Sequence, residues 1–443
     1  MSYLSKPILV VSTAAVFTSM SCQVPNANTN NQPNVNTAVA QATPVPTPES
    51  TVDTSDTLFT LPMLGALLAD ESFVSEAKRS ISMTDEELER LRSISRDAVA
   101  QLSDEDMDGS RSSRAANEQA RAKIGEVLGN DRTEKLIALA QQHAGNTDAE
   151  TANKPGNVPT DTRVVVNAPE YRMDVFKDGK LIKSYKIGIG YPEFPLPSGL
   201  RKASTIIFNP TWTPPDEPWV KGKVKAGEKV EAGDKLNPLG PIKIPIGLPS
   251  LIHGGKSPAR LGTFASHGCV GLTDGQVEDF ATVLSGLAGD AVSQEQIKSY
   301  EKAKTETKEV KLRQPVPVEL RYETIVVEDG KLKIFRDVYE KGTNTEENLA
   351  KVLSAYGLSL DSLDPQIKDK ILDALRQMAT DAQGHPADPS SSNAASSNSR
   401  SKGSSNSNSG AVTRTIKGKK EIDIPIPQLA GKGYPAPVSM KMQ

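Results

Sequence analysis

The chain has 443 residues, which is long enough for two or three domains. Aromatic residues make up only 5% of it, and 31 prolines and 32 glycines are many for one compact globule, so part of the chain is expected to be linker or disordered. A formal net charge of −3 argues against a strongly basic nucleic-acid-binding protein and against a polybasic membrane patch.

Residues 1–22 have the layout of a secretory signal peptide. An apolar run over residues 7–17 is too short for a transmembrane helix and leads through small residues to Cys22. This resembles a lipoprotein signal, in which Cys22 is lipidated, although Ser19 stands where leucine is commoner. Gln23 in place of aspartate favours an outer-membrane anchor. We expect an exported, periplasmic protein held in the membrane by this lipid anchor; the alternative is a soluble periplasmic protein.

Three segments with different compositions follow. Residues 23–56 are rich in Asn, Thr, Pro, Gln and Ser, which predicts a disordered tether. Residues 57–145 repeat apolar side chains at helical spacing, and Thr84 with Glu87 is typical of a capping box. A helical accessory region is therefore predicted there, followed by a linker over residues 146–160.

From residue 161 the apolar period becomes strand-like, with Asp178-Gly179 as a hairpin signal. Short strands punctuated by Pro and Gly predict a mainly β domain over residues 161–340, antiparallel in its pairing, with a short helix from Thr273 to about Leu287. Residues 345–380 have a helical pattern. Residues 386–443 begin with a Ser- and Asn-rich stretch and are predicted to be a disordered tail.

The segment that indicates chemistry is LIHGGKSPARLGTFASHGCVGL, residues 251–272. It contains two of the four histidines, His253 and His267, and the cysteine that remains free if Cys22 is lipidated, Cys269. A thiol attacks an amide as thiolate, so it needs a base, usually a histidine, and that histidine needs a partner to fix its tautomer. Backbone amides around Gly268 and Cys269 are candidate donors to an oxyanion.

Two other interpretations apply to these residues. A cysteine taken alone is more often a buried structural thiol, and a histidine taken alone is more often a polar residue whose hydrogen bonds are satisfied. Two histidines and a cysteine are also zinc ligand types. Their combination in one short, glycine-rich, polar loop favours nucleophilic catalysis, and we predict no metal and no cofactor.

This segment resembles the signature of the L,D-transpeptidase (YkuD-type) catalytic domain, an early His-Gly followed by Ser/Thr-His-Gly-Cys and an apolar residue. Upstream, Pro195-Leu196-Pro197-Ser198-Gly199 and Asn237-Pro238-Leu239-Gly240 look like segments of the same family, and the resemblance covers about residues 160–340. It implies a YkuD-like β-sandwich with a short helix after the catalytic loop.

The resemblance also implies a role for each residue of the loop. Cys269 would be the nucleophile, His253 the base, and the Gly254 carbonyl the group that orients the His253 ring. Ser266 and His267 would shape the pocket, and Gly268 would contribute to the oxyanion hole.

Family members act on stem peptides of peptidoglycan. The cysteine displaces D-Ala after the third stem residue, forms a thioester and passes the acyl group to an amine, which crosslinks two stems or attaches an envelope protein. The partners implied are therefore peptidoglycan stems, an envelope protein as the alternative acceptor, and the membrane through the anchor, with no nucleic acid. The alternatives are an L,D-carboxypeptidase and a non-catalytic wall-binding lipoprotein.

One position departs from the family pattern. Two residues after the cysteine, where the family commonly has arginine or asparagine, this chain has Gly271. Either the enzyme accepts amidated, uncharged donor stems, or Arg260 (or Lys256) of the same loop supplies the missing cation for a substrate carboxylate.

Overall fold

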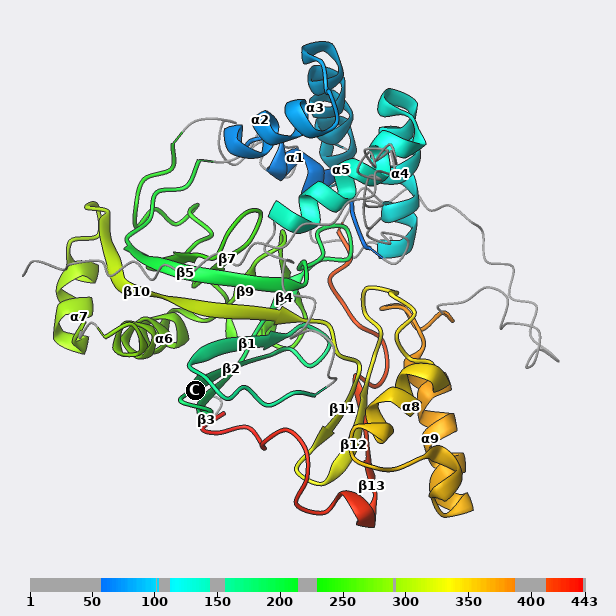
Figure 1. Ribbon diagram of the computed structural model, residues 1–443. Coiled ribbons are helices and arrows are strands. Elements are labelled where there is room, and N and C mark those ends of the chain that lie inside the picture. Colours follow the sequence, from blue (N-terminus) through cyan, green and yellow to red (C-terminus); the bar gives the residue numbers. More distant parts are fainter. Residues whose placement is uncertain are drawn as a thin grey trace, which may run out of the picture. The chain divides into compact units, whose positions relative to one another are not determined.

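The computed structural model describes residues 57–100, 102, 112–143, 156–213, 229–289, 292–386 and 412–440 (Figure 1). The predicted signal peptide, Cys22, the tether and most of the linker over residues 146–160 lie outside these ranges. Within them, no helix combines the length and the apolar character needed to span a membrane.

The N-terminal helices are confirmed. They are α1 (Leu61–Leu67), α2 (Glu71–Ser80), α3 (Asp85–Ala100), α4 (Ser113–Leu128) and α5 (Asn130–His143). The predicted capping box is present, because the Glu87 amide donates to the Thr84 hydroxyl at 3.2 Å and the Glu87 carboxylate accepts from the Thr84 amide at 2.9 Å. The apolar faces bury one shared core that includes Leu64, Phe73 and Leu91.

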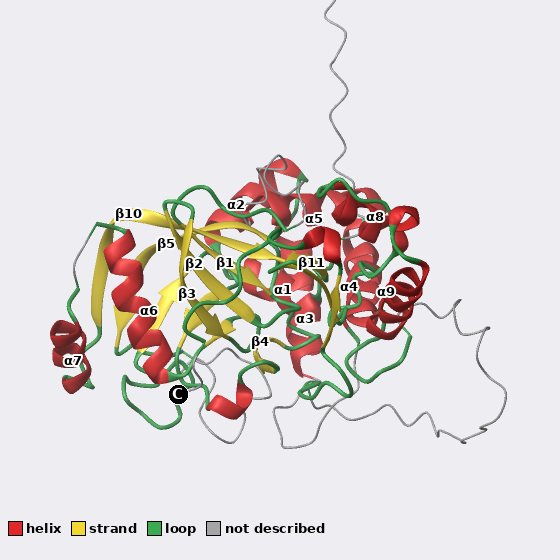
Figure 2. Cartoon of the chain, turned by 90° about the horizontal axis from the view of Figure 1, so that it is seen from below, coloured by secondary structure: helices red, strands yellow, loops and turns green. Residues whose placement is uncertain are grey.

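The mainly β domain is also confirmed, and its centre is one eight-stranded sheet (Figures 1 and 2). The strands, in spatial order, are β3 (Lys180–Lys186), β2 (Arg172–Lys177), β1 (Arg163–Asn167), β10 (Lys308–Arg321), β5 (Gly199–Phe208), β6 (Ile242–Pro245), β7 (Leu251–His253) and β9 (Val270–Gly271). The expectation of purely antiparallel pairing is wrong. β1 pairs with β10 in parallel, and so does β7 with β9, because in each pair the chain returns to the sheet through a long crossover.

The sheet curls until its two ends meet. The chain leaves β3 at one edge, and Gly188 then exchanges both backbone hydrogen bonds with Gly271 of β9, at 2.9 Å each. Directly after this bridge β4 (Ile189–Gly190) pairs with β8 (Phe264–Ser266). A side chain at Gly188 would bring its Cβ within 2.5 Å of the Ala265 Cβ, so this close approach requires glycine.

Helix α6 (Asp274–Leu287) follows β9 and is the predicted helix after the catalytic loop. Thr273 caps it, accepting from the Gln276 amide at 3.2 Å. The helix crosses the sheet (Figure 2) and buries Val277, Phe280 and Leu284 against it. Its Asp279 accepts a hydrogen bond from the Tyr185 hydroxyl of β3 at 2.6 Å, and α7 (Gln294–Lys302) packs beside it.

A second, smaller sheet changes the interpretation of the C-terminal part. It has the order β11 (Ile325–Glu328), β12 (Lys331–Phe335) and β13 (Glu421–Pro425), with α8 (Glu346–Ser354) and α9 (Pro365–Met378) packed on it (Figure 1). The disordered tail predicted from residue 386 is therefore wrong for residues 412–440. Ile424 and Ile426 bury their side chains in this unit. The apolar segment that contains them is short and follows a long polar stretch, so composition favoured the prediction of disorder.

Candidate active site

Two neighbouring strands hold the predicted base and lead from the predicted nucleophile. His253 at the end of β7 lies opposite Gly271 of the parallel strand β9. Side chains alternate along strands, so the neighbours Ile252 and Val270 point into the core, where both are fully buried, and His253 points to the opposite face. Cys269 directly precedes β9, and the Leu251 amide of β7 acts on its thiol, so the thiol lies at the same pair of strands as His253.

The His253 imidazole is held in one tautomer. Its Nδ1 lies 2.8 Å from the Gly254 carbonyl oxygen, which can only accept, so Nδ1 carries the proton in the neutral ring. The Leu239 backbone also interacts with the imidazole and, like Gly254, acts to raise its pKa. Burial lowers the pKa of His253 to about 3, and the nearby Lys256 ammonium contributes in the same direction. The ring is consequently neutral at physiological pH and able to accept a proton at Nε2.

The nucleophile follows a tight turn from Ser266 to Cys269. The Ser266 hydroxyl accepts from the Cys269 amide at 3.0 Å and donates to the Cys269 carbonyl at 2.6 Å. Ser250 closes the turn from outside, because its buried hydroxyl donates to the Gly268 carbonyl at 2.8 Å. Of the two amides expected to face an oxyanion, the one of Cys269 already donates to the Ser266 hydroxyl in this structure.

Cys269 is half-buried and not disulfide-bonded. Burial raises the pKa of its thiol, while the Leu251 amide and the Lys256 ammonium act in the opposite direction without cancelling the effect. The resting pair is thus a neutral thiol beside a neutral imidazole.

His267 lies in an aromatic setting rather than beside the sheet. Its ring makes edge contacts with Tyr191 and Phe194, at centroid distances of 5.1 and 4.6 Å. Burial lowers the pKa of His267 to about 3, with Lys256 and Arg414 adding to the shift. Arg260 reaches the same group, donating to the Tyr191 hydroxyl at 3.3 Å.

Gly271 is covered by Lys256. A Cβ at position 271 would lie 2.9 Å from the Lys256 Cγ and 3.1 Å from its Cε, so the aliphatic part of Lys256 occupies the space that a side chain at 271 would need. The Lys256 ammonium lowers the pKa values of His253, His267 and Cys269, so its charge acts on all three groups.

The structure therefore brings the predicted loop residues together and adds four that sequence reasoning did not identify: Ser250, Tyr191, Phe194 and Arg414. Ser250 directly precedes the segment 251–272, and this position was the only signal for it in the sequence. Arg414 lies in the segment 386–443, whose polar composition predicts disorder and therefore gave no reason to place this residue near the site. In the described part of the chain, no three His, Cys, Asp or Glu side chains gather so as to hold a metal ion.

A family model and several solved structures match part of this chain. Residues 161–315 match the family model of the L,D-transpeptidase (YkuD) catalytic domain, which ends before the expected limit near residue 340. No curated protein matches the chain.

Solved structures of L,D-transpeptidases resemble part of the chain. The catalytic domain from E. faecium is 17% identical over 37% of this chain and 100% of that one, with a TM-score of 0.24. The same domain acylated by ertapenem is 21% identical, over 27% and 86%, with a TM-score of 0.20. An L,D-transpeptidase from Mycobacterium smegmatis is 14% identical, over 36% and 58%, with a TM-score of 0.23, so this chain spans somewhat more than half of that structure.

The neutral pair predicts a specific pH dependence. Because the thiol pKa is raised, alkylation of Cys269 by iodoacetamide should be slow at pH 7 and still rising with pH above 9. The measurement is the pseudo-first-order rate from pH 5 to 10 in a Cys22→Ser background, with the additional Cys269→Ala variant as the blank. A rate that is already maximal below pH 7 would indicate a thiolate–imidazolium pair instead and contradict this description.

Proposed function

We propose, from the premise that residues 161–315 form an L,D-transpeptidase (YkuD) catalytic domain, that the protein is a peptidoglycan L,D-transpeptidase with Cys269 as its nucleophile. The observation that supports the proposal is that the strand bearing His253 pairs with the strand that directly follows Cys269, while the Gly254 carbonyl accepts from His253 Nδ1 and thereby fixes the tautomer. This is the arrangement that a cysteine acyltransferase requires.

The reaction follows from these groups. His253 Nε2 takes the thiol proton as the Cys269 sulfur attacks the carbonyl carbon of the third stem residue. The Gly268 amide is the donor of this turn that we assign to the oxyanion, since the Cys269 amide already donates to Ser266. When the tetrahedral intermediate collapses, the C–N bond breaks, His253 returns the proton to the departing amine of D-Ala, and a thioester remains. An amine acceptor then attacks the thioester, and the thiol is regenerated.

The neutral resting pair is compatible with this chemistry. A free thiolate would need the charge of an imidazolium beside it, and the burial of both groups disfavours that ion pair. Proton transfer is therefore coupled to attack on the bound donor. The requirement for bound donor keeps the thiol unreactive when no substrate fills the site.

The first test concerns the nucleophile. Ertapenem, which acylates the similar E. faecium domain, should add covalently to the wild-type chain and not to Cys269→Ala, as intact mass will show. His253→Ala should slow this acylation by about 10²–10⁴-fold, the usual contribution of a general base. An adduct on Cys269→Ala would exclude Cys269 as the nucleophile, and a fast His253→Ala variant would exclude His253 as the base.

We further propose that Lys256 is the cation that recognises a donor carboxylate, in place of the family's residue at position 271. Its side chain lies across Gly271, and its ammonium lies beside the nucleophile. Arg260 remains the competing candidate, since its guanidinium contacts Tyr191 next to His267. The amidated-donor alternative requires neither cation.

Lys256→Met and Arg260→Met separate these options. A charge-assisted contact is worth about 1.5–3 kcal/mol, so Lys256→Met should reduce the preference for free-acid over amidated tetrapeptide donors roughly 10- to 100-fold. The readout is the ratio of acylation rates on the two donors, which cancels any general effect on the thiol pKa. Arg260→Met is the matched variant and should leave the ratio unchanged. The assignment fails if Arg260→Met alone shifts the ratio, or if wild type prefers the amidated donor.

The export and lipid anchor rest on the sequence of residues 1–22 alone, and we propose them on that ground. Cys22→Ala should move the protein from the detergent phase to the aqueous phase in Triton X-114 partitioning of whole-cell extracts. Cys269→Ala is the matched cysteine control and should partition as wild type. Unchanged partitioning of Cys22→Ala would show that no lipid is attached there.

A further inference from the structure

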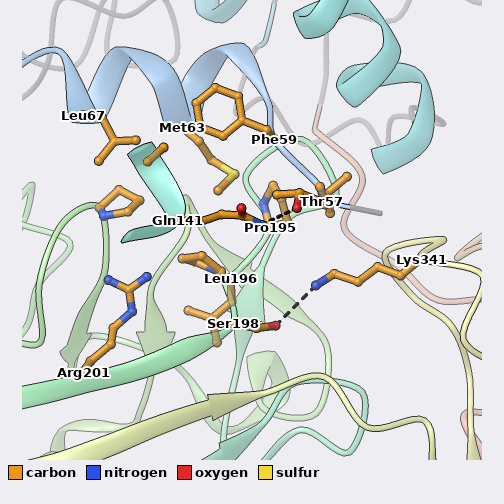
Figure 3. Close-up of a pocket in the computed structure, with 14 residues that line it drawn as sticks. Thr57, Phe59, Met63, Leu67, Gln141, Pro195, Leu196, Ser198, Arg201 and Lys341 are labelled. Carbon is orange, nitrogen blue, oxygen red and sulfur yellow. Dashed lines mark hydrogen bonds between the residues drawn. The ribbon is translucent and has the colours of Figure 1, made fainter. Parts of the chain in front are cut away.

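A cavity of about 220 Å³ lies between the start of the helical region and the segment that leads into β5 (Figure 3). Its walls are mostly apolar. Phe59, Met63 and Leu67 come from α1 and the residues before it, and Leu196 comes from the opposite side. None of its lining residues belongs to the catalytic segment 251–272, so it is a separate site.

One cation of this cavity is Arg201, on β5. Its side chain is only 5% exposed, and its Nη1 donates to the carbonyl oxygens of Gly247 and Leu248 at 3.4 and 3.1 Å. Nε and Nη2 are buried, and within the described ranges neither has a hydrogen-bond acceptor. Burial lowers the pKa of Arg201 to about 10, so the group stays charged at neutral pH. A buried guanidinium with two unused donors is costly unless an anion completes it.

A second cation, Lys341, enters the cavity from the other side (Figure 3). Its Nζ lies 3.3 Å from the Ser198 hydroxyl and 4.6 Å from the centre of the Tyr322 ring. The neighbouring carboxylate, Asp337, does not take this charge directly. It accepts instead from the Tyr322 hydroxyl at 2.6 Å and from the amides of Lys341, Gly342 and Thr343.

The cavity therefore combines two cations with apolar walls, and no aspartate or glutamate is among its lining residues. Charge complementarity favours an anion between the two cations. The apolar side chains favour a hydrocarbon body against the walls that they form. We propose that this cavity binds a small acidic amphiphile, with a carboxylate between Arg201 and Lys341 and an apolar group against Phe59, Met63 and Leu67. Such a carboxylate is found on a medium-chain fatty acid and at the C-terminus of an apolar peptide.

The cavity lies next to two segments that contact the catalytic loop. The proposed binding does not depend on the proposed reaction. Pro195–Ser198 line the cavity directly after Phe194, whose ring packs against His267. Pro249 also lines it, and the next residue, Ser250, holds the Gly268 carbonyl. A bound ligand would therefore contact both segments that lead to the loop.

The test is isothermal titration of the full chain with octanoate, octanol and octylamine, which share a hydrocarbon body and differ in charge. Octanoate should bind saturably, and octanol and octylamine at least tenfold more weakly. Arg201→Met and Lys341→Met should each weaken octanoate at least tenfold. Lys202→Met, which removes the exposed cation next in sequence on β5, is the matched control and should bind as wild type.

A second arm identifies the source of the carboxylate. Dileucine with a free C-terminus is compared with its C-terminal amide; binding of the free acid more tightly than octanoate assigns the site to peptide ends, and the reverse order assigns it to fatty acids. If Arg201→Met does not fold by circular dichroism, Lys341→Met decides. Equal binding of octanoate and octanol, unchanged binding by a folded Arg201→Met or Lys341→Met variant, or no binding of either carboxylate would overturn the proposal.

Discussion

The backbone pairing of Gly188 with Gly271 is the constraint on which the arrangement of the site depends. It joins the two ends of the curled sheet within two residues of the nucleophile, and it tolerates no side chain at Gly188. Because Gly271 is also paired with His253 on the other side, the same short strand fixes both the thiol and the imidazole. Strands far apart in the sequence thereby set the geometry of one loop.

The space above Gly271 has a different occupant. It is filled by Lys256, which comes from the loop after His253. The cation at this position of the sheet therefore comes from the preceding loop and not from β9. The same ammonium opposes protonation of both histidines, which adds to their burial in keeping them neutral.

The mainly β fold with N-terminal helices was predicted from apolar periodicity, and the structure confirms it. The roles of Cys269, His253 and the Gly254 carbonyl stay predictions, drawn from the motif and the family that it resembles. The parallel pairings of β1 with β10 and of β7 with β9 were not predicted, since local periodicity carries no information on which distant strands become neighbours.

Three further features could not be predicted, because they depend on the folded structure and not on local sequence. β13 follows a long polar segment and pairs with β12, which lies almost ninety residues earlier in the chain. The engagement of the Cys269 amide by Ser266 depends on the turn geometry, which the glycine-rich sequence leaves open. Arg201 looks like an ordinary strand cation in the sequence, and only burial distinguishes it from Lys202.

The proposed reaction is the transfer of an acyl group from a peptidoglycan stem. The most direct measurement is mass analysis of the products after the purified chain is incubated with disaccharide tetrapeptide. We expect release of D-Ala together with dimers crosslinked between two third residues. Release of D-Ala with only tripeptide products would indicate hydrolysis instead of transfer, and unchanged tetrapeptide would contradict the assignment of this site to acyl transfer.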